Sequence, residues 1–148
     1  MDKFEIEEIS KDNLRNLAAL FVALWPECNI DEEYDECARI LHSDDDTCFL
    51  VRASENDVAF IHVAIRRDYV EGALHSPTGY IEGLFVKEDF RNAGLSRLLL
   101  DLAEKWSKQK NCTQIASDTE VVNTDSINFH KKVGFEEVNR VMCFIKNI

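Results

Sequence analysis

The sequence contains no apolar run that approaches the roughly 20 residues needed to cross a bilayer, so a membrane protein is excluded. Its first residues, Met1 to Glu5, lack the basic segment, apolar stretch and small-residue cleavage site of a secretory signal. We therefore expect a cytoplasmic protein. The chain also lacks repeats and low-complexity tracts, and its 148 residues with 45% hydrophobic side chains predict a single globular domain over 1–148.

Positive charge is scarce. Lys and Arg number 17 against 28 Asp and Glu, which gives a formal net charge of −11. Such a field repels phosphate backbones and favours cations, so no nucleic-acid partner is expected. Between Pro26 and Asp46 the acidic side chains are met by only one arginine, Arg39. That stretch is either a solvated face or one wall of a cation-binding cleft.

The cysteines show neither disulfide nor metal-site spacing. They are odd in number, far apart, and not paired with a nearby Cys or His. We expect reduced, mostly buried thiols, no metal and no cysteine nucleophile. The five are Cys28, Cys37, Cys48, Cys112 and Cys143.

Two amphipathic helices are expected near the amino terminus. The first is predicted to be capped by Ser10 and ended by Pro26, because its apolar residues recur at i, i+3, i+4 and i+7. A weaker helix is predicted from about Asp31 to His42. The apolar positions of the first helix are Leu14, Leu17, Ala18, Phe21 and Trp25.

Strands and helices alternate in the remainder of the chain. Residues 47–53 and 58–66 predict an antiparallel hairpin, 67–79 a loop and 80–86 a strand. A leucine-rich helix follows from Leu95 to Trp106, and then come a short buried strand at 113–117 and a helix capped by Thr124 or Asp125. Gly134 ends that helix, and 135–145 is predicted as a last strand. This order predicts an α/β fold whose ligands bind where neighbouring strands diverge.

The turn before the leucine-rich helix, Phe90 to Ser96, is a candidate anion site. The amino-terminal N–H groups of a helix have no partners within the helix, and the helix dipole favours negative charge there. Gly94 lets the backbone approach an anion closely, and Arg91 adds positive charge. The alternative is an ordinary strand-to-helix turn with a glycine.

Two segments resemble the GCN5-related N-acetyltransferases. Tyr80 to Val86, followed by Arg91-x-x-Gly94-x-Ser96, is similar to their acetyl-coenzyme A signature of Gln or Arg, two residues, Gly, one residue, and Gly or Ala. Ser96 departs from the last position of that signature. A further set of residues resembles the second signature of the family: Asn123, Ser126, Phe129, His130, Gly134 and Phe135.

The resemblance implies a single-domain GNAT fold, with a mixed, mostly antiparallel sheet whose central strands splay apart and whose faces are flanked by helices. It also implies acetyl-CoA as co-substrate, with the strand backbone pairing with the pantetheine arm and the following turn holding the pyrophosphate. The residues expected at the cofactor are Phe85, Val86, Arg91, Asn92, Ala93, Gly94, Leu95, Ser96, Asn123 and Phe129.

Five short segments narrow the resemblance to the aminoglycoside 6′-N-acetyltransferases. This resemblance implies direct acetylation of the 6′-amine of these antibiotics in a ternary complex, hence drug resistance, and a homodimer. The segments are 24–26, 66–70, 82–86, 116–119 and 134–137.

Acyl transfer to an amine requires a held carbonyl, a neutral amine and stabilisation of the oxyanion and the departing thiolate. Gly83 within a strand predicts a bulge or a close backbone approach that frees the N–H of Leu84 for the carbonyl oxygen, unless it is a tolerated glycine in a plain strand. Glu82 is the first choice of general base and Asp118 a second amine-binding carboxylate, although either can be a solvated strand-end side chain.

Four further residues are expected at the amine substrate. Trp25 and Tyr69 can form an apolar floor and rim for sugar rings, and Asp68 and Glu137 can add negative charge. Trp25 is equally well explained by core packing, because it completes the apolar stripe of the first helix. His130 stands where many family members carry a tyrosine that protonates the thiolate. It is either that proton donor or a packing histidine.

Two other functions remain open from the sequence. One is acetylation of polyamines or protein amines on the same fold, since an acidic cleft fits spermidine as well. The other is a non-catalytic acyl-CoA-binding module. Glu82 and Asp118 beside the pyrophosphate turn argue against that module, because binding the thioester alone requires neither carboxylate.

Overall fold

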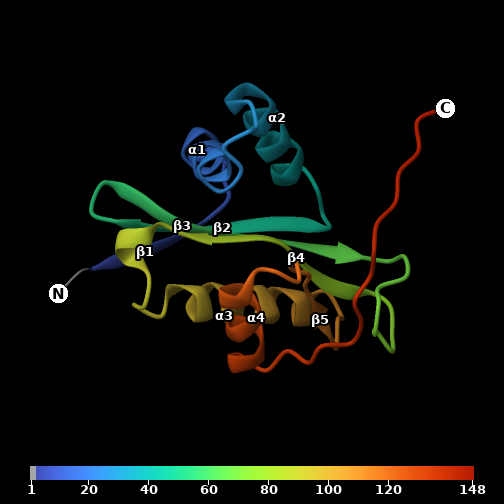
Figure 1. Cartoon of the computed structure of the whole chain (residues 1–148). Coiled ribbons are helices and arrows are strands. Elements are labelled where there is room, and N and C mark those ends of the chain that lie inside the picture. The colour runs from blue at the N-terminus through green and yellow to red at the C-terminus, as the bar shows by residue number, and fades with distance from the viewer. Residues whose placement is uncertain (1–2) are drawn as a thin grey trace.

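The computed structural model describes residues 3–148, which form one five-stranded sheet with helices on both faces. The strands lie in the order β1-β2-β3-β4-β5, antiparallel except for the parallel pair of β4 and β5. Helices α1 and α2 cover one face, and α3 and α4 lie on the other (Figure 1). The elements are β1 Phe4–Glu8, α1 Leu14–Leu24, α2 Ile30–Leu41, β2 Asp46–Ala53, β3 Asn56–Arg66, β4 Thr78–Val86, η1 Glu88–Phe90, α3 Leu95–Gln109, β5 Ile115–Ala116 and α4 Thr124–Lys132. The predicted mixed, mostly antiparallel α/β architecture is confirmed.

Strand β3 separates two hydrophobic clusters. Phe60 packs with α1 and α2, whereas its neighbour Ile61 packs with α3, because successive side chains of a strand point to opposite faces. All residues from Val58 to Ile65 are buried. The hairpin of β2 and β3 was predicted correctly, because such a continuous apolar run is typical of a strand covered on both faces.

The amino-terminal helix begins later than predicted. Its N-cap is Asn13, and the predicted cap Ser10 lies in the preceding turn. There the Ser10 N–H donates to Oδ1 of Asn13 at 2.9 Å, and Oγ of Ser10 accepts weakly from the N–H of Asp12 at 3.3 Å. The cap prediction was wrong because these local bonds close a turn before the helix starts. The apolar stripe and the end before Pro26 are confirmed.

Strand β1 was not predicted. Within residues 3–148 it is an edge strand paired with β2 alone, and three of its five residues are exposed. Its sequence, FEIEE, is largely acidic, so the alternation of Phe4 and Ile6 was a weak signal.

Two carboxyl-terminal elements, α4 and β5, differ from expectation. The cap of α4 is Asn123, whose Oδ1 accepts from the Ser126 N–H at 3.1 Å, so the predicted caps Thr124 and Asp125 belong to the first turn. Strand β5 is shorter than predicted and half-buried rather than buried. The predicted end of α4 is confirmed, since Gly134 has a φ of +101°.

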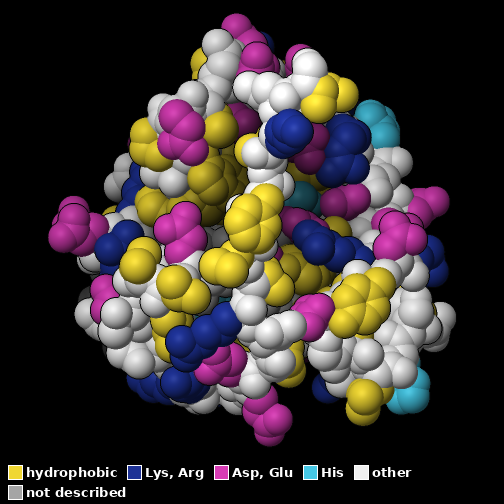
Figure 2. Space-filling model, turned by 45° about the vertical axis from the view of Figure 1, so that its right-hand side comes forward, with side chains coloured by type: hydrophobic (Ala, Val, Ile, Leu, Met, Phe, Trp, Pro, Cys, Tyr) yellow, Lys and Arg dark blue, Asp and Glu magenta, His cyan; other side chains and the backbone are white. Residues whose placement is uncertain are grey.

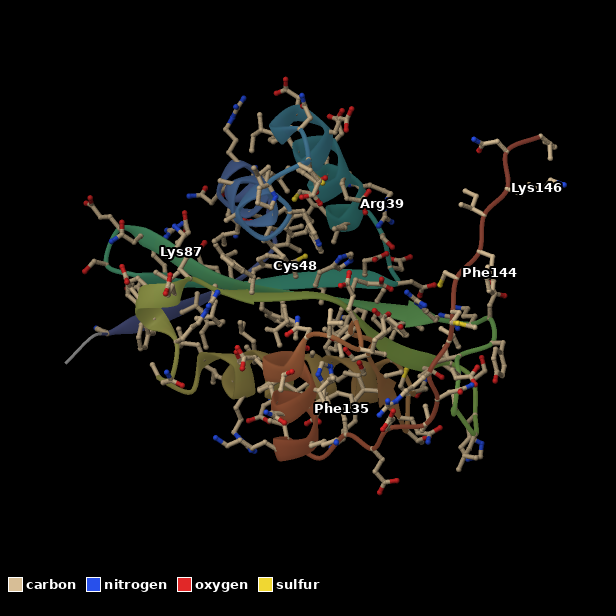
Figure 3. All side chains as sticks on the ribbon, viewed as in Figure 1. Arg39, Cys48, Lys87, Phe135, Phe144 and Lys146 are labelled. Atoms are coloured by element: carbon tan, nitrogen blue, oxygen red, sulfur yellow. The ribbon has the colours of Figure 1, made fainter. Side chains whose placement is uncertain are left out.

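The last strand, predicted over 135–145, does not form within this chain. Residues 135–148, which we call the C-terminal arm, are neither helix nor strand and extend away from the sheet and helices (Figures 1 and 3). The prediction failed because a strand requires a neighbour, and the arm leaves the sheet of its own chain. Its apolar side chains are consequently exposed, at 62% for Val138, 81% for Met142 and 97% for Ile145.

All five cysteines, which lie within the described part of the chain, are free thiols. Cys37, Cys48 and Cys112 are buried, while Cys143 on the arm is exposed. Burial raises the pKa of Cys37 to about 12 and that of Cys48 well above its usual value, so neither thiol ionises near neutral pH. None of the helices in residues 3–148 is both long and apolar enough to span a bilayer.

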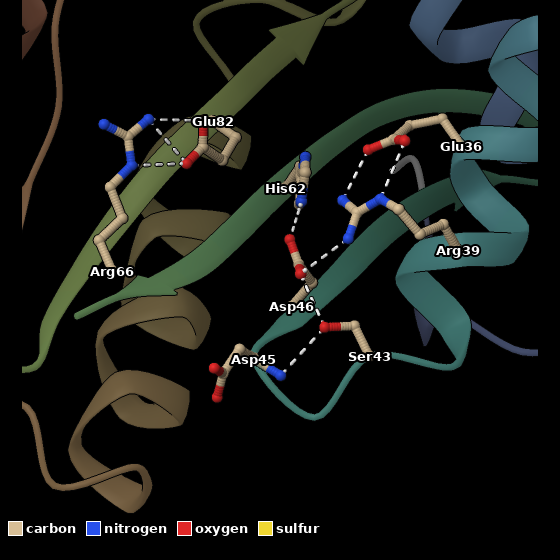
Figure 4. Close-up of polar contacts among 8 residues, drawn as sticks. All are labelled: Glu36, Arg39, Ser43, Asp45, Asp46, His62, Arg66 and Glu82. Carbon is tan, nitrogen blue, oxygen red and sulfur yellow. Dashed lines mark hydrogen bonds and ion pairs between the residues drawn. The ribbon is translucent and has the colours of Figure 1, made fainter. Parts of the chain in front are cut away.

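A polar cluster joins the end of α2 to β2 and β3 (Figure 4). Asp46 accepts hydrogen bonds from Nε2 of His62 at 2.9 Å, from Oγ of Ser43 at 2.8 Å and from Arg39 at 3.3 Å. Burial opposes ionisation of this carboxyl, but the bonds from His62, Ser43 and Arg39 outweigh it and lower the pKa of Asp46 far below its usual range.

Replacing Asp46 with asparagine should lower the free energy of unfolding at pH 7 by about 2 kcal/mol, because hydrogen bonds to a charged partner are lost. A carboxyl whose folded pKa is depressed stabilises the protein above its unfolded pKa of about 3.9 and loses that contribution as the pH falls below it. The difference between wild type and Asp46→Asn should therefore shrink as the pH falls below about 4. Urea unfolding at pH 7 and pH 3 measures this, and a constant difference would contradict the assignment.

Candidate active site

Strands β4 and β5 separate soon after they meet. They pair only at Gly79 with Ile115 and at Tyr80 with Ala116. From Ile81 to Val86, no described strand pairs with the β5 side of β4. This gap between parallel neighbours is the predicted splay, and it leaves backbone groups free to bind an extended ligand.

The antiparallel ladder determines which backbone groups face the gap. The Lys87 N–H donates to the Val58 carbonyl at 2.8 Å, so alternation directs the N–H groups of Phe85 and Gly83 to β3 and those of Leu84 and Val86 to the gap. The Val86 carbonyl also faces the gap, where it accepts from Nε of Arg91 at 2.9 Å. The backbone N–H groups of Leu84 and Val86 thus face the gap, as expected for residues that bind the cofactor through their backbone. The N–H of Phe85 instead faces β3, and its side chain packs against the core near Phe60.

A bulge interrupts β4 at the expected place. His62 pairs with Gly83 and Val63 with Ile81, which leaves Glu82 without a residue opposite it. A Cβ on Gly83 would lie 2.8 Å from Cη2 of Trp25, so the glycine also permits a close approach. The extra residue reorients Glu82, and the missing side chain of Gly83 leaves room for the indole ring of Trp25 against the backbone.

The turn before α3 has the form of an anion site. Gly94 is the N-cap of α3 with a φ of +81°, and no side chain in the described part of the chain caps this helix end. A Cβ at Gly94 would meet no described atom within 4 Å, so the approach to the first-turn N–H groups is open. Asn92, Ala93 and Gly94 are exposed, and Ser96 is half-buried in the first turn of α3. The turn therefore fits a pyrophosphate group.

The second signature places His130 between two elements. Its Nδ1 lies 2.6 Å from the Ser126 carbonyl oxygen, which can only accept, so Nδ1 carries the proton. Its Nε2 lies 2.8 Å from Oγ of Ser117 and accepts from that hydroxyl when the ring is neutral. The ring also packs against Phe129 and Phe135. His130 on α4 is thus a packing residue whose two ring nitrogens are both hydrogen-bonded, one of them to Ser117 just after β5.

Glu82 and Asp118 are joined by two residues that sequence reasoning had not assigned to the site. Arg66 donates Nε and Nη2 to Glu82, each at 3.0 Å, and its Cζ lies 3.4 Å from the Tyr80 ring centroid. The Tyr80 hydroxyl in turn donates a hydrogen bond to Asp118. Burial and the bond to Asp118 raise the pKa of Tyr80 to about 12, so it stays a neutral donor. The sequence offered one signal for these two residues. Arg66 ends the strand predicted over 58–66, and Tyr80 begins the strand predicted over 80–86.

The other expected substrate residues occupy different surroundings. Trp25 is half-buried and packs edge-on against Phe21, so it belongs to the core as well as to the wall beside Glu82. Tyr69 is 81% exposed and donates to Glu71 at 3.0 Å, and Asp68 is exposed. Glu137 lies on the C-terminal arm.

The described residues contain no group of three or more His, Cys, Asp or Glu side chains that could hold a metal ion.

On the arm, a hydrogen bond from Arg140 lowers the pKa of Glu137. Acidic, basic and apolar side chains are interspersed on the face that Figure 2 presents.

Comparisons with known proteins agree with this geometry. Residues 10–135 match the sequence model of the acetyltransferase (GNAT) family. The chain is 38% identical over 138 residues to an aminoglycoside N(6′)-acetyltransferase type 1 of Serratia marcescens, covering 93% of this chain and 94% of that protein. It is 34% identical to a protein of the same name from Salmonella enteritidis, covering 96% and 98% respectively.

A solved structure of the aminoglycoside acetyltransferase AAC(6′)-Iy, in complex with a bisubstrate analogue of CoA and acetylneamine, superimposes with a TM-score of 0.93 at 33% identity and covers 99% of both chains. The AAC(6′)-Ih enzyme of Acinetobacter baumannii gives 0.91 at 33% identity, with the same coverage. The chain belongs to the GNAT family of acetyltransferases. Within that family, its similarity to the aminoglycoside N(6′)-acetyltransferases extends over almost its whole length.

Proposed function

We propose that this acetyltransferase transfers the acetyl group of acetyl-CoA to the 6′-amine of aminoglycoside antibiotics. The observation that carries the proposal is the pair of carboxylates, Glu82 and Asp118, beside the gap between β4 and β5. Relatives over 30% identical bear the name of this activity, and one solved relative holds CoA joined to an aminoglycoside in a bisubstrate analogue.

Acetyl-CoA supplies the activated acetyl group when bound, and the chain offers it two backbone sites. The N–H groups at the start of α3, with Gly94 at their approach, suit the pyrophosphate. The gap-facing backbone of Leu84 and Val86 suits the pantetheine arm and the acetyl oxygen. We assign the Leu84 N–H as the oxyanion donor, a role whose loss typically costs about 10²–10³ in rate.

The carboxylates serve the amine. One carboxylate about 4 Å from an ammonium contributes roughly 4 kcal/mol at an effective dielectric near 20, before desolvation. The same negative charge keeps the ammonium protonated, so transfer requires a base. We assign Glu82 as that base, directly or through a water, and Asp118 as a second cation partner. Trp25, Tyr69, Asp68 and Glu137 are proposed sugar and amine contacts, and His130 the proton donor to the thiolate.

Acetylation removes one positive charge from the drug and weakens its binding to ribosomal RNA, which would make the host resistant. We place the reaction in the cytoplasm, where ribosomes and acetyl-CoA are found. The protein's own net charge of −11 disfavours nucleic acid as a direct partner.

Thiol release with kanamycin, tobramycin, spermidine and a lysine peptide tests the substrate class. We expect turnover with the two drugs at a kcat/KM at least about tenfold above that of the other amines, because several ammonium groups can meet the acidic site together. Mass spectrometry and NMR of the product locate the acetyl group. Turnover of spermidine or the peptide alone would assign the enzyme to polyamines or protein amines instead, and acetyl-CoA binding without any turnover would indicate a binding module.

We further propose that the protein is a homodimer whose subunits exchange their C-terminal arms. Strand β5 is at the sheet edge, and α1, α2, α3 and α4 cover the two faces of that sheet. The arm carries an uninterrupted apolar run, Val141 to Ile145, which is typical of a strand buried on both faces. The arm of a second copy, paired with β5, would supply the strand that the sequence predicts over 135–145.

A further inference from the structure

We propose that Arg66 is a positioning and specificity-determining residue that holds Glu82 in the resting enzyme and gives way only to polycationic amines. The inference rests on the proposed function, because it concerns how the same site chooses its substrate. It is carried by the contacts of Arg66 with Glu82, drawn in Figure 4, and with Tyr80, the hydrogen-bond partner of Asp118.

Arg66 fixes Glu82 at its bulge. The guanidinium binds the carboxylate as a fork, with Nε to Oε1 and Nη2 to Oε2, each at 3.0 Å. Glu82 has no residue opposite it in the ladder, so this two-point contact, with its defined plane, orients the side chain. A lysine, which presents a point charge, cannot reproduce that orientation.

Arg66 is itself held in place by Tyr80. The guanidinium lies over the ring, with Cζ 3.4 Å from its centroid, while the hydroxyl of Tyr80 donates to Asp118. Arg66 therefore contacts Glu82 and the aromatic residue that anchors Asp118. Its positive charge compensates one of the two carboxylates, so a cation approaching the site meets less negative charge than the two carboxylates alone would present.

The ion pair is exposed enough to be exchanged. The side chain of Arg66 is 42% exposed and that of Glu82 is 27% exposed, and ion pairs with this access to water are worth little. An amine that reaches Glu82 must still overcome repulsion from the Arg66 charge. A polycation can do so by binding Asp118 and other carboxylates with its remaining ammonium groups, whereas a singly charged amine has no such compensation.

Arg66→Met removes the charge and the fork but retains an unbranched, apolar stem of similar reach, and Arg66→Lys retains the charge without the fork. We expect Arg66→Met to lower kcat for kanamycin about tenfold through loss of positioning. It should also reduce the kcat/KM preference for kanamycin over a lysine peptide by about threefold to fivefold.

Arg66→Lys should share the fall in kcat but keep the substrate preference of wild type. Arg67→Met is the matched control, because Arg67 pairs with Asp45, and we expect its kinetics to be unchanged. Thermal unfolding of all three variants checks that they are folded.

An unchanged substrate preference in a folded Arg66→Met would overturn the inference, as would an equal loss of that preference in Arg66→Met and Arg66→Lys. Failure of the proposed function is separate, because it would appear as absent kanamycin turnover in the wild type. In that case calorimetric titration of kanamycin and of a lysine peptide into wild type and Arg66→Met decides the inference. The same threefold to fivefold change in relative affinity supports it, and equal affinities overturn it.

Discussion

Glu82→Gln should reduce kcat by roughly 10²–10⁴, the usual contribution of a general base, while the affinity for acetyl-CoA is unchanged. The glutamine is isosteric and can still accept from Arg66, but it cannot remove a proton from the amine. Acetyl-CoA affinity should persist because the N–H groups at the start of α3 and the gap-facing backbone of Leu84 do not involve this side chain. Stopped-flow or steady-state thiol release measures kcat, and titration calorimetry measures cofactor binding.

Two comparisons separate the base from an electrostatic partner. Asp118→Asn should mainly raise KM for the drug, since we assign that carboxylate to binding. The double variant Glu82→Gln with Arg66→Met removes both charges of the ion pair. If Glu82 served only to neutralise Arg66, the double variant would recover activity over Glu82→Gln. If Glu82 is the base, the double variant would stay as inactive as Glu82→Gln. Wild-type turnover in Glu82→Gln would exclude Glu82 as the base.

Periodicity predicted the elements that are buried along one stripe or on both faces. The helix α1, the β2–β3 hairpin and α3 follow from apolar spacing, because those side chains must leave water in any fold of this chain. The helix caps at Asn13 and Asn123 did not follow, since several neighbouring polar side chains could each bond the same N–H groups. Strand β1 was not predicted, because acidic residues make up much of this solvent-facing edge strand and weaken its apolar alternation.

At the site, glycines and motif spacing predicted the backbone features. Gly83 marked a bulge and a close approach, and Gly94 marked the open turn before α3. The links through Arg66 and Tyr80 could not be predicted from spacing, because Arg66 and Glu82 are 16 residues apart and meet only through the register of β3 and β4. A shift of one residue would direct Glu82 to the other face of the sheet.

The predicted final strand has a different kind of explanation, because its sequence is typical of a buried strand although the arm pairs with no strand of its own chain in the described residues. Val141, Met142, Phe144 and Ile145 are 70–97% exposed. Phe144 lies on a part of the arm that projects from the body (Figure 3). Burying each such side chain contributes about 1.5–3 kcal/mol, so two exchanged arms offset the roughly 4–15 kcal/mol that association costs.

Deletion of residues 136–148 should therefore convert a dimer into a monomer and expose the β5 edge. Most activity should be lost with it, because Ser117 and Asp118 directly follow β5.

A milder change, Val141→Asp with Phe144→Asp, should raise the dimer dissociation constant by at least about 100-fold, since each charge would be buried at the new strand. Lys146→Ala is the matched control. Multi-angle light scattering across a concentration series measures the mass, and a wild-type monomer at all concentrations, or a dimer that survives both aspartates, would show that the arm is not the interface.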